Sequence, residues 1–416
     1  MAEPINSKVP KIRFKGFAGE WEEKTLGDLG AFKNGMNFGK EAMGHGNPFV
    51  NLQNVFGQFV VDDQKLELAV SSAVQRREYN LLKGDVLFIR SSVKPEGVGE
   101  TALVTKTLID TTYSGFIIRY RPEVLMSDDF NRIVYRTSLV RKQILASASR
   151  SANTNINQKA LQRIEIQIPD FSEQTQIGTY FRELDRLIEL HQRKYDKLVT
   201  LKKAMLQKMF PQPGATTPEI RFKGFEGEWV EKKLGDVTSL QTGHPFEGKK
   251  FVKEGVLLIR GMNVKRGNLD TSKAASEYWP SVLGYENFLL EEDDIVIQMD
   301  GALIGKSYAK IEKENLPALL VQRVTRVRCA VVNCDFIYQY IQKDFLGYIR
   351  STKTETAVPH LSLNDIRDFS VVLPDKAEQQ KIGTYFRTLD ALIAKHAIQL
   401  AKLKQIKSAC LDKMFV

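Results

Sequence analysis

The 416-residue sequence is poor in the residues that build disulfides and metal sites. It contains three cysteines and five histidines, and the histidines form no His-x-x-x-His pair. So few cysteines cannot form a disulfide framework, and neither residue type has the spacing of a zinc site. No apolar run approaches the ~18 residues that cross a bilayer, and the N-terminal stretch "MAEPINSKVPK" lacks the apolar core of a signal peptide. We therefore expect a cytoplasmic protein without membrane contact and without a bound metal.

Glycine-rich cofactor loops are lacking as well. The nearest approach is "DGALIGKS" (Asp300–Ser307), but three residues separate its glycines where a phosphate-binding loop needs four. The stretch "GNPFV" (Gly46–Val50) has one proline and is not the Asn-Pro-Pro-aromatic motif of an amino-methyltransferase. No spacing of carboxylates marks an acid–base pair. The sequence thus predicts a chain that is not an enzyme and binds no cofactor of its own.

What the sequence has in excess is positive charge. It carries 60 Lys and Arg against 50 Asp and Glu, a formal net charge of +10 at pH 7. A basic balance of this size favours a polyanionic partner, and nucleic acid is the first candidate.

Parts of the sequence are also written twice. "KIRFKGFAGEW" (Lys11–Trp21) returns as "EIRFKGFEGEW" (Glu219–Trp229), with nine of eleven positions identical. The stretch Glu173–Phe210 returns as Glu378–Phe415, with 21 of 38 positions identical. Because the offsets of 208 and 205 residues nearly agree, the chain consists of two tandem halves. Their ends are held constant while their middle parts have diverged.

The repeated stretch that closes each half has the pattern of a long helix. Apolar or aromatic residues recur in steps of four and three, the 3.5-residue period of a coiled-coil seam. Asp170 with Glu173, and Asp375 with Glu378, have capping-box spacing at the two helix starts. Such a stripe needs a partner, which is either the other helix or the neighbouring domains. The expected seam residues are Ile177, Phe181, Leu184, Ile188, His191, Tyr195 and Leu198 in the first helix and Ile382, Phe386, Leu389, Ile393, His396, Leu400 and Leu403 in the second.

The middle part of each half has the pattern of a mixed α/β domain. Strands are indicated at 85–89, 164–169 and 294–297, and helical spacing around 129–145 and 335–350. We predict an α+β protein of two tandem, pseudo-symmetric halves, each a mixed α/β domain followed by a long helix. The two helices pair as an antiparallel coiled coil, with His191 facing Leu400 and His396 facing Tyr195. The predicted divisions are domain 1 (1–168), helix 1 (169–210), a linker (211–219), domain 2 (220–373) and helix 2 (374–416).

The motifs at the two ends of each half are specific in combination. Each half opens with "P-x-IRFKGF…W…LGD", at Pro10–Asp28 and Pro218–Asp236. Each closes with Pro-x-x-x-Glu-Gln-x-x-Ile-Gly-x-x-Phe, within "IQIPDFSEQTQIGTYFRELD" and "VVLPDKAEQQKIGTYFRTLD". In these motifs, and in the order of its parts, essentially the whole chain resembles the specificity subunit of a type I restriction–modification system.

The resemblance implies two target-recognition domains, each reading half of a bipartite site in double-stranded DNA. The paired helices are then a spacer that docks modification (methyltransferase) subunits, of which two are expected. Restriction subunits add a translocase and a nuclease, so S-adenosylmethionine, ATP and Mg are expected on the partner subunits. Because the two middle segments differ in sequence, the two half-sites should differ as well.

Polar loops after the predicted strands are the candidate DNA contacts. Arg and Lys suit guanine, Asn and Gln suit adenine, and phosphates take cations and small polar groups. Aligning the halves by their shared ends places 260–268, 298–306 and 356–360 opposite the loops near 51–54, 90–97 and 149–157. The candidates are Asn51, Gln53, Arg90, Lys94, Asn153, Thr154 and Asn155 in the first half and Arg260, Asn263, Lys265, Arg266, Lys306 and His360 in the second.

Three alternatives fit part of the pattern. An independent nucleic-acid enzyme fits the charge, although the sequence shows no catalytic motif. A coiled-coil scaffold without sequence readout explains the helices but not two divergent domains. A specificity chain of a methylation-only or other defence complex has the same sequence features as one that serves restriction.

Overall fold

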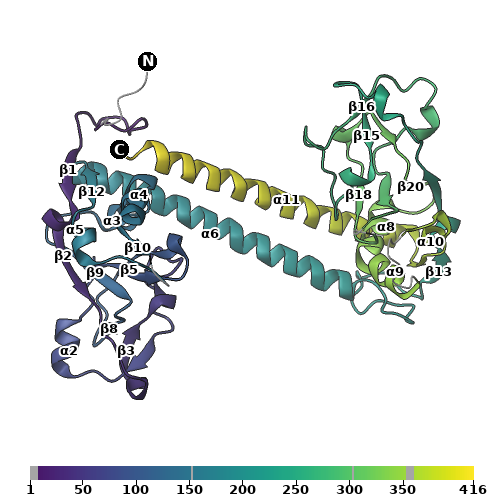
Figure 1. Ribbon diagram of the computed structural model, residues 1–416. Coiled ribbons are helices and arrows are strands. Elements are labelled where there is room, and N and C mark those ends of the chain that lie inside the picture. The colour runs from purple at the N-terminus through teal and green to yellow at the C-terminus, as the bar shows by residue number, and fades with distance from the viewer. Residues whose placement is uncertain (1–7, 151–152, 302–303, 353–359) are drawn as a thin grey trace. The chain divides into compact units, whose positions relative to one another are not determined.

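The computed structural model describes residues 8–150, 153–301, 304–352 and 360–416. The chain forms two compact units, the first made of Met1–Gln192 with Ile398–Val416 and the second of Arg193–Ala397. Each unit holds one mixed α/β domain, the beginning of the long helix that follows it and the end of the other long helix (Figure 1). The first unit is therefore discontinuous in sequence, and the boundaries of both units fall within the long helices.

The first unit is built around a four-stranded antiparallel sheet. Its strands, in spatial order, are β2 (Gly30–Asn34), β9 (Ile117–Pro122), β5 (Val86–Ile89) and β7 (Thr101–Leu103). The smaller sheets are β4 (Glu67–Ala69) with β3 (Met43–Val50) and β8 (Thr112–Tyr113); β10 (Ser149–Arg150) with β11 (Thr154–Asn155) and β6 (Ser91–Ser92); and β1 (Glu22–Thr25) with β12 (Glu165–Ile168). The short helices are α1 (Leu26–Leu29), α2 (Ala73–Glu78), α3 (Asp128–Val134), α4 (Ser138–Ser147) and α5 (Gln158–Gln162).

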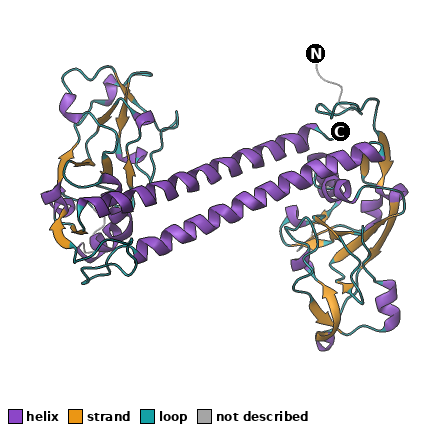
Figure 2. Ribbon diagram, turned by 180° about the vertical axis from the view of Figure 1, so that it is seen from behind, coloured by secondary structure: helices purple, strands orange, loops and turns teal. Residues whose placement is uncertain are grey.

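The second unit repeats this plan (Figure 2). Its four-stranded sheet is β14 (Thr238–Thr242), β20 (Val324–Cys329), β17 (Ile295–Gln298) and β18 (Tyr308–Lys310). The smaller sheets are β16 (Tyr278–Trp279) with β15 (Val256–Ile259) and β19 (Ala318–Leu320), and β13 (Val230–Lys233) with β21 (Ser370–Leu373). The short helices are α7 (Leu234–Val237), α8 (Cys334–Tyr340), α9 (Leu346–Thr352) and α10 (Leu363–Arg367), with a π-helical turn at Ile341–Phe345 between α8 and α9.

The strands predicted from apolar runs are buried on both faces. In β5, Val86 and Phe88 enter one hydrophobic core of the first unit while Leu87 and Ile89 enter another. A strand that separates two cores has no polar face, which is why its sequence shows no alternation. Strand β17 of the second unit is placed in the same way.

The two long helices, α6 (Phe171–Lys208) and α11 (Lys376–Lys413), have 38 residues each, about 57 Å at 1.5 Å per residue. In the first unit Asp185 pairs with Lys407, and the Tyr180 hydroxyl lies 3.5 Å from Cys410 Sγ. Residue numbers rise along one helix as they fall along the other, so the helices run antiparallel, and the fold-class prediction is confirmed. Continued within this unit, that register brings His191 to the level of Leu400.

The seam positions follow the expected stripe. Three of these residues are buried at the start of each helix, and Leu400 is buried in the second half of α11; the remaining expected positions are half-buried. At the starts, the partner of the stripe is the domain as well as the other helix. Phe181 lies in the core of the first domain, and Phe386 in that of the second.

A glycine in each helix lets it approach its own domain closely. A Cβ atom on Gly178 would come within 2.6 Å of the backbone nitrogen of Phe130 in α3. A Cβ on Gly383 would come within 2.3 Å of the Asn333 side chain, at the start of α8. At Gly178 the contact is with backbone, so a side chain there would force the helix away from α3. At Gly383 it is with the Asn333 side-chain oxygen, which accepts from the Phe336 nitrogen at the start of α8.

The repeated opening stretch fastens each unit at the end of the helix that enters from the other half. The Ile12 backbone nitrogen donates to the Lys413 carbonyl at 2.9 Å in the first unit. The Ile220 nitrogen donates to the Lys208 carbonyl at 2.8 Å in the second. Phe415, at the end of α11, packs on Trp21 with 6.2 Å between ring centres. This shared docking function explains why the same eleven residues occur twice.

Candidate nucleic-acid interface

Polar segments expected to contact DNA in the first half come together in the first unit. Strand β11, which carries Thr154 and Asn155, pairs antiparallel with β6, the strand that begins directly after Arg90. Lys94 and Asn153 line one hollow of about 370 Å³ in this region. The segments lie about 60 residues apart in sequence, and the three-stranded sheet brings them to one place.

The turn at 51–54 lines the same hollow through Leu52. The side-chain amides of Asn51 and Gln53 both donate to the Glu67 carboxylate, at 3.0 and 2.9 Å. Asn51 also accepts from the Leu52 backbone nitrogen, so both ends of its amide hold the turn. Gln53 is exposed and is the better placed of the two for a contact with DNA.

Arg90 and Lys94 carry positive charge without a carboxylate partner within hydrogen-bonding or ion-pair distance in the part of the chain that the structure describes. The Arg90 guanidinium is half-buried and donates to the Gly115 carbonyl at 3.3 Å, and the Lys94 side chain is exposed. By contrast, Arg121 of the same unit holds both oxygens of Asp85, at 2.6 and 2.7 Å. Cations left without a counter-ion on a loop are suited to phosphates and guanine.

The remaining candidates of the first unit are placed differently. Thr154 is buried in β11, so its side chain is less accessible than those of its neighbours. The Asn155 amide donates to the Asn153 carbonyl at 2.9 Å, which holds the turn that precedes β11. Asn153 itself is exposed.

The second unit brings its candidates to corresponding positions. Asp300 forms an antiparallel bridge with His360, as Ser91 pairs with Asn155 in the first unit. His360 is exposed and Lys306 is half-buried. The predicted stretch "TAVPH" begins at residue 356, and its first four residues lie outside the described part of the chain.

The loop after β15 carries the other candidates of the second unit. Arg266 is exposed and Lys265 is half-buried. Neither forms an ion pair among the described residues, although the charge of Lys265 acts on Asp270. Arg260 donates to the Ala275 carbonyl at 2.7 Å and lies 3.9 Å from Glu277, so its charge is partly compensated.

Asn263 has no exposed atom with which to contact DNA. Its side-chain oxygen accepts from the Arg260 nitrogen, and its amide donates to the Asp270 and Ala275 carbonyls. Asn54 of the first unit makes the same set of bonds, to the Asn51 nitrogen and to two carbonyls. Both asparagines hold a 3₁₀ turn, and we leave Asn263 out of the proposed contacts.

Several residues of these loops were not among the sequence candidates. Arg323 is 68% exposed at its side chain, forms an ion pair of 2.9 Å with Asp300 and has a positive φ of 66°. In the first unit Val93 and Phe116 are exposed apolar side chains on the polar loops. An exposed apolar residue gives no signal in sequence, because the same letter is usual in a core.

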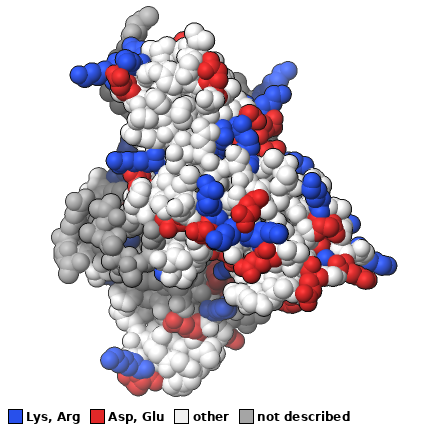
Figure 3. Space-filling model, turned by 90° about the vertical axis from the view of Figure 1, so that its right-hand side faces the viewer, with Lys and Arg blue, Asp and Glu red and all other residues white. Residues whose placement is uncertain are grey.

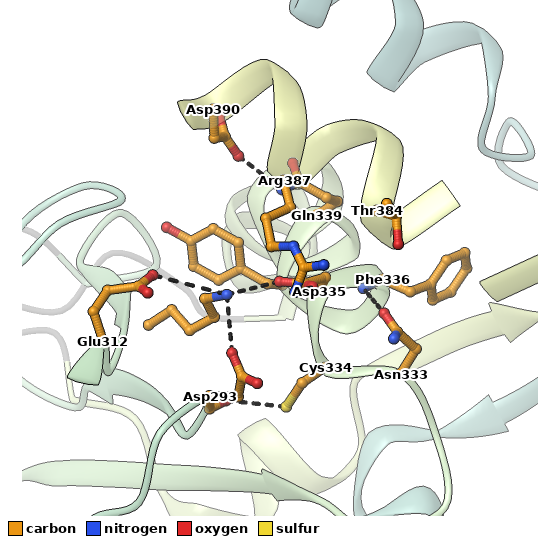
Figure 4. A network of polar contacts seen from close by, with 12 residues as sticks. Asp293, Glu312, Asn333, Cys334, Asp335, Phe336, Gln339, Thr384, Arg387 and Asp390 are labelled. Carbon is orange, nitrogen blue, oxygen red and sulfur yellow. Dashed lines mark hydrogen bonds and ion pairs between the residues drawn. The ribbon is translucent and has the colours of Figure 1, made fainter. Parts of the chain in front are cut away.

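Several charged groups away from these loops are paired with one another. In the second unit the Lys310 ammonium group lies 3.0, 3.8 and 2.7 Å from the carboxylates of Asp293, Glu312 and Asp335, which are labelled in Figure 4. Burial opposes the charge of Lys310, but the hydrogen bond and the attraction of Asp335 outweigh it and raise the pKa of the lysine. On the face drawn in Figure 3, acidic and basic side chains are interspersed. We infer that the network around Lys310 stabilises the fold of the second unit and does not contact DNA.

The described residues show no group of three or more His, Cys, Asp or Glu that would hold a metal ion. No helix within the described ranges is long and apolar enough to cross a membrane. Two similarly folded units, each with basic residues on the polar loops after its strands, define a duplicated nucleic-acid-binding protein.

Comparison with known families identifies the class more closely. The type I restriction modification DNA specificity domain matches this chain twice, at residues 18–200 and 226–405. These two matches cover most of the chain, which therefore belongs to this family, and the resemblance seen in the sequence is confirmed. The family supplies DNA specificity and no catalysis, so the chain is a specificity subunit and not an enzyme.

Individual relatives agree with this assignment. The type I restriction enzyme MjaVIII specificity subunit of Methanocaldococcus jannaschii is 23% identical over 345 residues, covering 80% of this chain and 79% of the relative. The EcoAI specificity subunit of Escherichia coli is 28% identical over 223 residues, covering 51% of this chain but only 37% of that relative's length. The S subunit of a type I system from M. genitalium has the same fold, with a TM-score of 0.65, 17% identity and coverage of 98% and 99% of the two chains.

Proposed function

We propose that this chain reads an asymmetric, bipartite site in double-stranded DNA, with one unit bound to each half-site. The observation that carries the proposal is that each unit places cations that form no ion pair on the polar loops after its strands. In the first unit Arg90 and Lys94 follow β5. In the second, Lys306 follows β17, the counterpart of β5, whereas Lys265 and Arg266 follow β15. Among the described residues none of these five forms an ion pair, although the charge of Lys265 acts on Asp270. The remaining contacts that we propose are Gln53, Asn153, Asn155, Arg260 and His360.

The asymmetry of the site follows from the divergence of the two loops. The side chains that bind the shared helices are repeated in both units, whereas the loop residues are not. A reader with different side chains selects different bases, so the half-sites differ. In this proposal the paired helices are the spacer, and the five divisions predicted from the sequence are its functional parts.

Catalysis in this proposal lies on partner subunits. Two methyltransferase subunits carry S-adenosylmethionine, and restriction subunits carry ATP and Mg. We propose the exposed lysines of the helices, Lys194, Lys197, Lys395 and Lys402, as part of the docking surface for the methyltransferase. Replacing these four by Glu should abolish co-purification with the methyltransferase, and unchanged co-purification would exclude them.

A genome-wide map of methylated adenines tests the readout. Cells that carry this chain with its methyltransferase should show one motif of two unlike half-sites with a fixed gap, absent from cells without the chain. Exchanging residues 30–168 for those of a relative of different specificity should change one half-site and leave the other. Methylation without a sequence motif would contradict the proposal and indicate that the chain is a coiled-coil scaffold that does not read sequence. A motif without restriction would indicate a methylation-only or other defence complex.

A further inference from the structure

An apolar hollow lies among the polar loops of the first unit. Val93, Phe116 and Phe56 line it and are 81%, 53% and 48% exposed. Grouped apolar side chains with such exposure mark a binding surface more often than chance placement. Among the described residues that line the hollow, Lys94 carries the one charge. The surface is therefore apolar in its floor and basic at its edge.

Local packing holds the apolar side chains in place. A Cβ atom on Gly97 would come within 2.8 Å of Phe56 Cε2, so the Phe56 ring lies directly on this glycine. The Phe116 carbonyl accepts from the Arg90 backbone nitrogen at 2.8 Å, and the Phe116 nitrogen donates to Ser114 Oγ at 3.3 Å. The hollow is thus built on the same backbone bonds as the basic loop.

The second unit has the same backbone here but different chemistry. The Met299 nitrogen donates to the Arg323 carbonyl at 2.9 Å, as Arg90 does to Phe116. Likewise the Leu361 nitrogen donates to the Met299 carbonyl, as Ile156 does to Arg90. These bonds make Arg323 the counterpart of Phe116. Asn54 and Asn263 hold matching turns, and Phe56 and Lys265 each lie two residues after the asparagine, so Lys265 is the counterpart of Phe56. Two apolar residues that line the hollow of the first unit thus correspond to cations in the second, of which Arg323 is paired with Asp300.

We propose that the hollow of the first unit receives the C5-methyl group of a thymine in its half-site, with Phe116 and Val93 as the residues that select it. The thymine methyl is the apolar group that base edges present in the major groove. Lys94 and Arg90 beside the hollow fit the phosphate or base edge next to that thymine. This inference rests on the proposed function, because it assumes that these loops face DNA.

Replacing thymidine by deoxyuridine tests the inference, since uracil differs from thymine by this methyl group alone. The complex of full-length chain and methyltransferase is titrated with duplexes carrying the mapped site, with one thymidine of the first unit's half-site replaced at a time. At one position, the replacement should weaken the affinity for the duplex about four-fold. This factor corresponds to the ~0.8 kcal/mol that is lost when one methyl group is no longer buried. Replacements in the other half-site should have no such effect.

Variants assign the effect to the hollow. With Phe116→Ala or Val93→Ala, the complex should bind the thymidine and deoxyuridine duplexes about equally, because the methyl group has lost its contact. Both side chains are exposed, so the fold should persist, which thermal unfolding checks. Ile109→Ala is the matched control, since Ile109 is equally exposed at 81% and does not line the hollow. It should keep the four-fold difference.

The possible failures are distinguishable. Absence of any methylation motif contradicts the proposed function itself. A motif with sequence-specific binding that is insensitive to deoxyuridine throughout the first half-site overturns the thymine proposal alone, as does a half-site without thymine. Persistence of the four-fold difference in Phe116→Ala and Val93→Ala also overturns it. Tighter binding to a mismatched base would instead indicate an unstacked base in the hollow.

Discussion

Arg13 binds Glu173 through two parallel hydrogen bonds, from Nε to Oε1 and from Nη2 to Oε2, each 2.7 Å long. Arg221 and Glu378 repeat this contact with the same two distances. Both carboxylates are completely buried, and the bond to Glu173 is the main reason why the pKa of Arg13 is raised. The fork ties the repeated opening stretch to the start of each long helix.

Arg13→Ala should lower the free energy of unfolding of the first unit by about 2–4 kcal/mol, because Glu173 is then left buried without a counter-ion. Arg13→Lys should recover only part of this loss, because lysine cannot form the two-bonded fork. Hydrogen exchange resolved by peptide would measure the loss in each unit separately. The exposed pair Arg186–Glu183 provides the control, and Arg186→Ala should change stability by less than ~0.5 kcal/mol. Equal losses in the two variants would contradict this role of Arg13.

Lys202 and Asp390 set the pairing of the helices in the second unit. Their 2.6 Å ion pair lies where the apolar seam is interrupted, and burial lowers the pKa of Lys202 against the opposing effect of Asp390. Lys202→Met should destabilise the second unit by about 1–3 kcal/mol, below the value for a fully buried pair because Asp390 is partly exposed.

The exchange Lys202→Asp with Asp390→Lys keeps the pair while reversing its direction. It should restore most of the stability lost in either single variant, as measured by urea unfolding in a double-mutant cycle. Additive losses in the double variant would show that the seam holds its register without this contact.

Asn263→Ala should destabilise the second unit without changing the DNA sequence that is read. The substitution leaves the Arg260 nitrogen and the Asp270 and Ala275 carbonyls without the bonds that Asn263 makes, at a cost of about 1–3 kcal/mol. Thermal unfolding and methylation mapping measure the two effects independently. Asn268→Ala, at an exposed position of the same loop, should leave stability within ~0.5 kcal/mol. A changed motif in stable Asn263→Ala protein would return this residue to the DNA contacts.

The sequence predicted the architecture because the relevant signals are periodic and duplicated. The seam of α6 and α11 and the apolar runs of β5 and β17 depend on local spacing. The repeat distinguished the opening stretches and long helices, which are similar in both halves, from the middle segments, which differ. The capping boxes at Asp170 and Asp375 were predicted only in part. Each aspartate accepts from the nitrogen three residues on, but the glutamate carboxylate turns to an arginine about 160 residues away.

The loops were harder to predict than the helices. Asn51 and Asn263 have the amide chemistry of adenine readers, yet tertiary contacts commit their amides to holding turns. Phe116 and Arg323 gave no signal, because their exposure follows from strand pairing between segments distant in sequence. Sequence therefore located the loops, while the choice of side chain within each loop depended on the fold.

The two basic loops should act on separate halves of the DNA site. Arg90→Ala with Lys94→Ala should weaken binding by about 1–3 kcal/mol per lost base contact and relax selectivity in the first half-site alone. Arg266→Ala should do the same for the second half-site, and each lost phosphate contact should reduce the slope of log affinity against log salt by about one. Binding of singly altered half-sites at several salt concentrations separates these effects. As the control, Lys83→Ala removes an exposed lysine that lies 3.6 Å from Asp128 and is absent from the proposed contacts, and it should leave selectivity intact. Loss of selectivity in both half-sites from either loop would contradict independent reading by the two units.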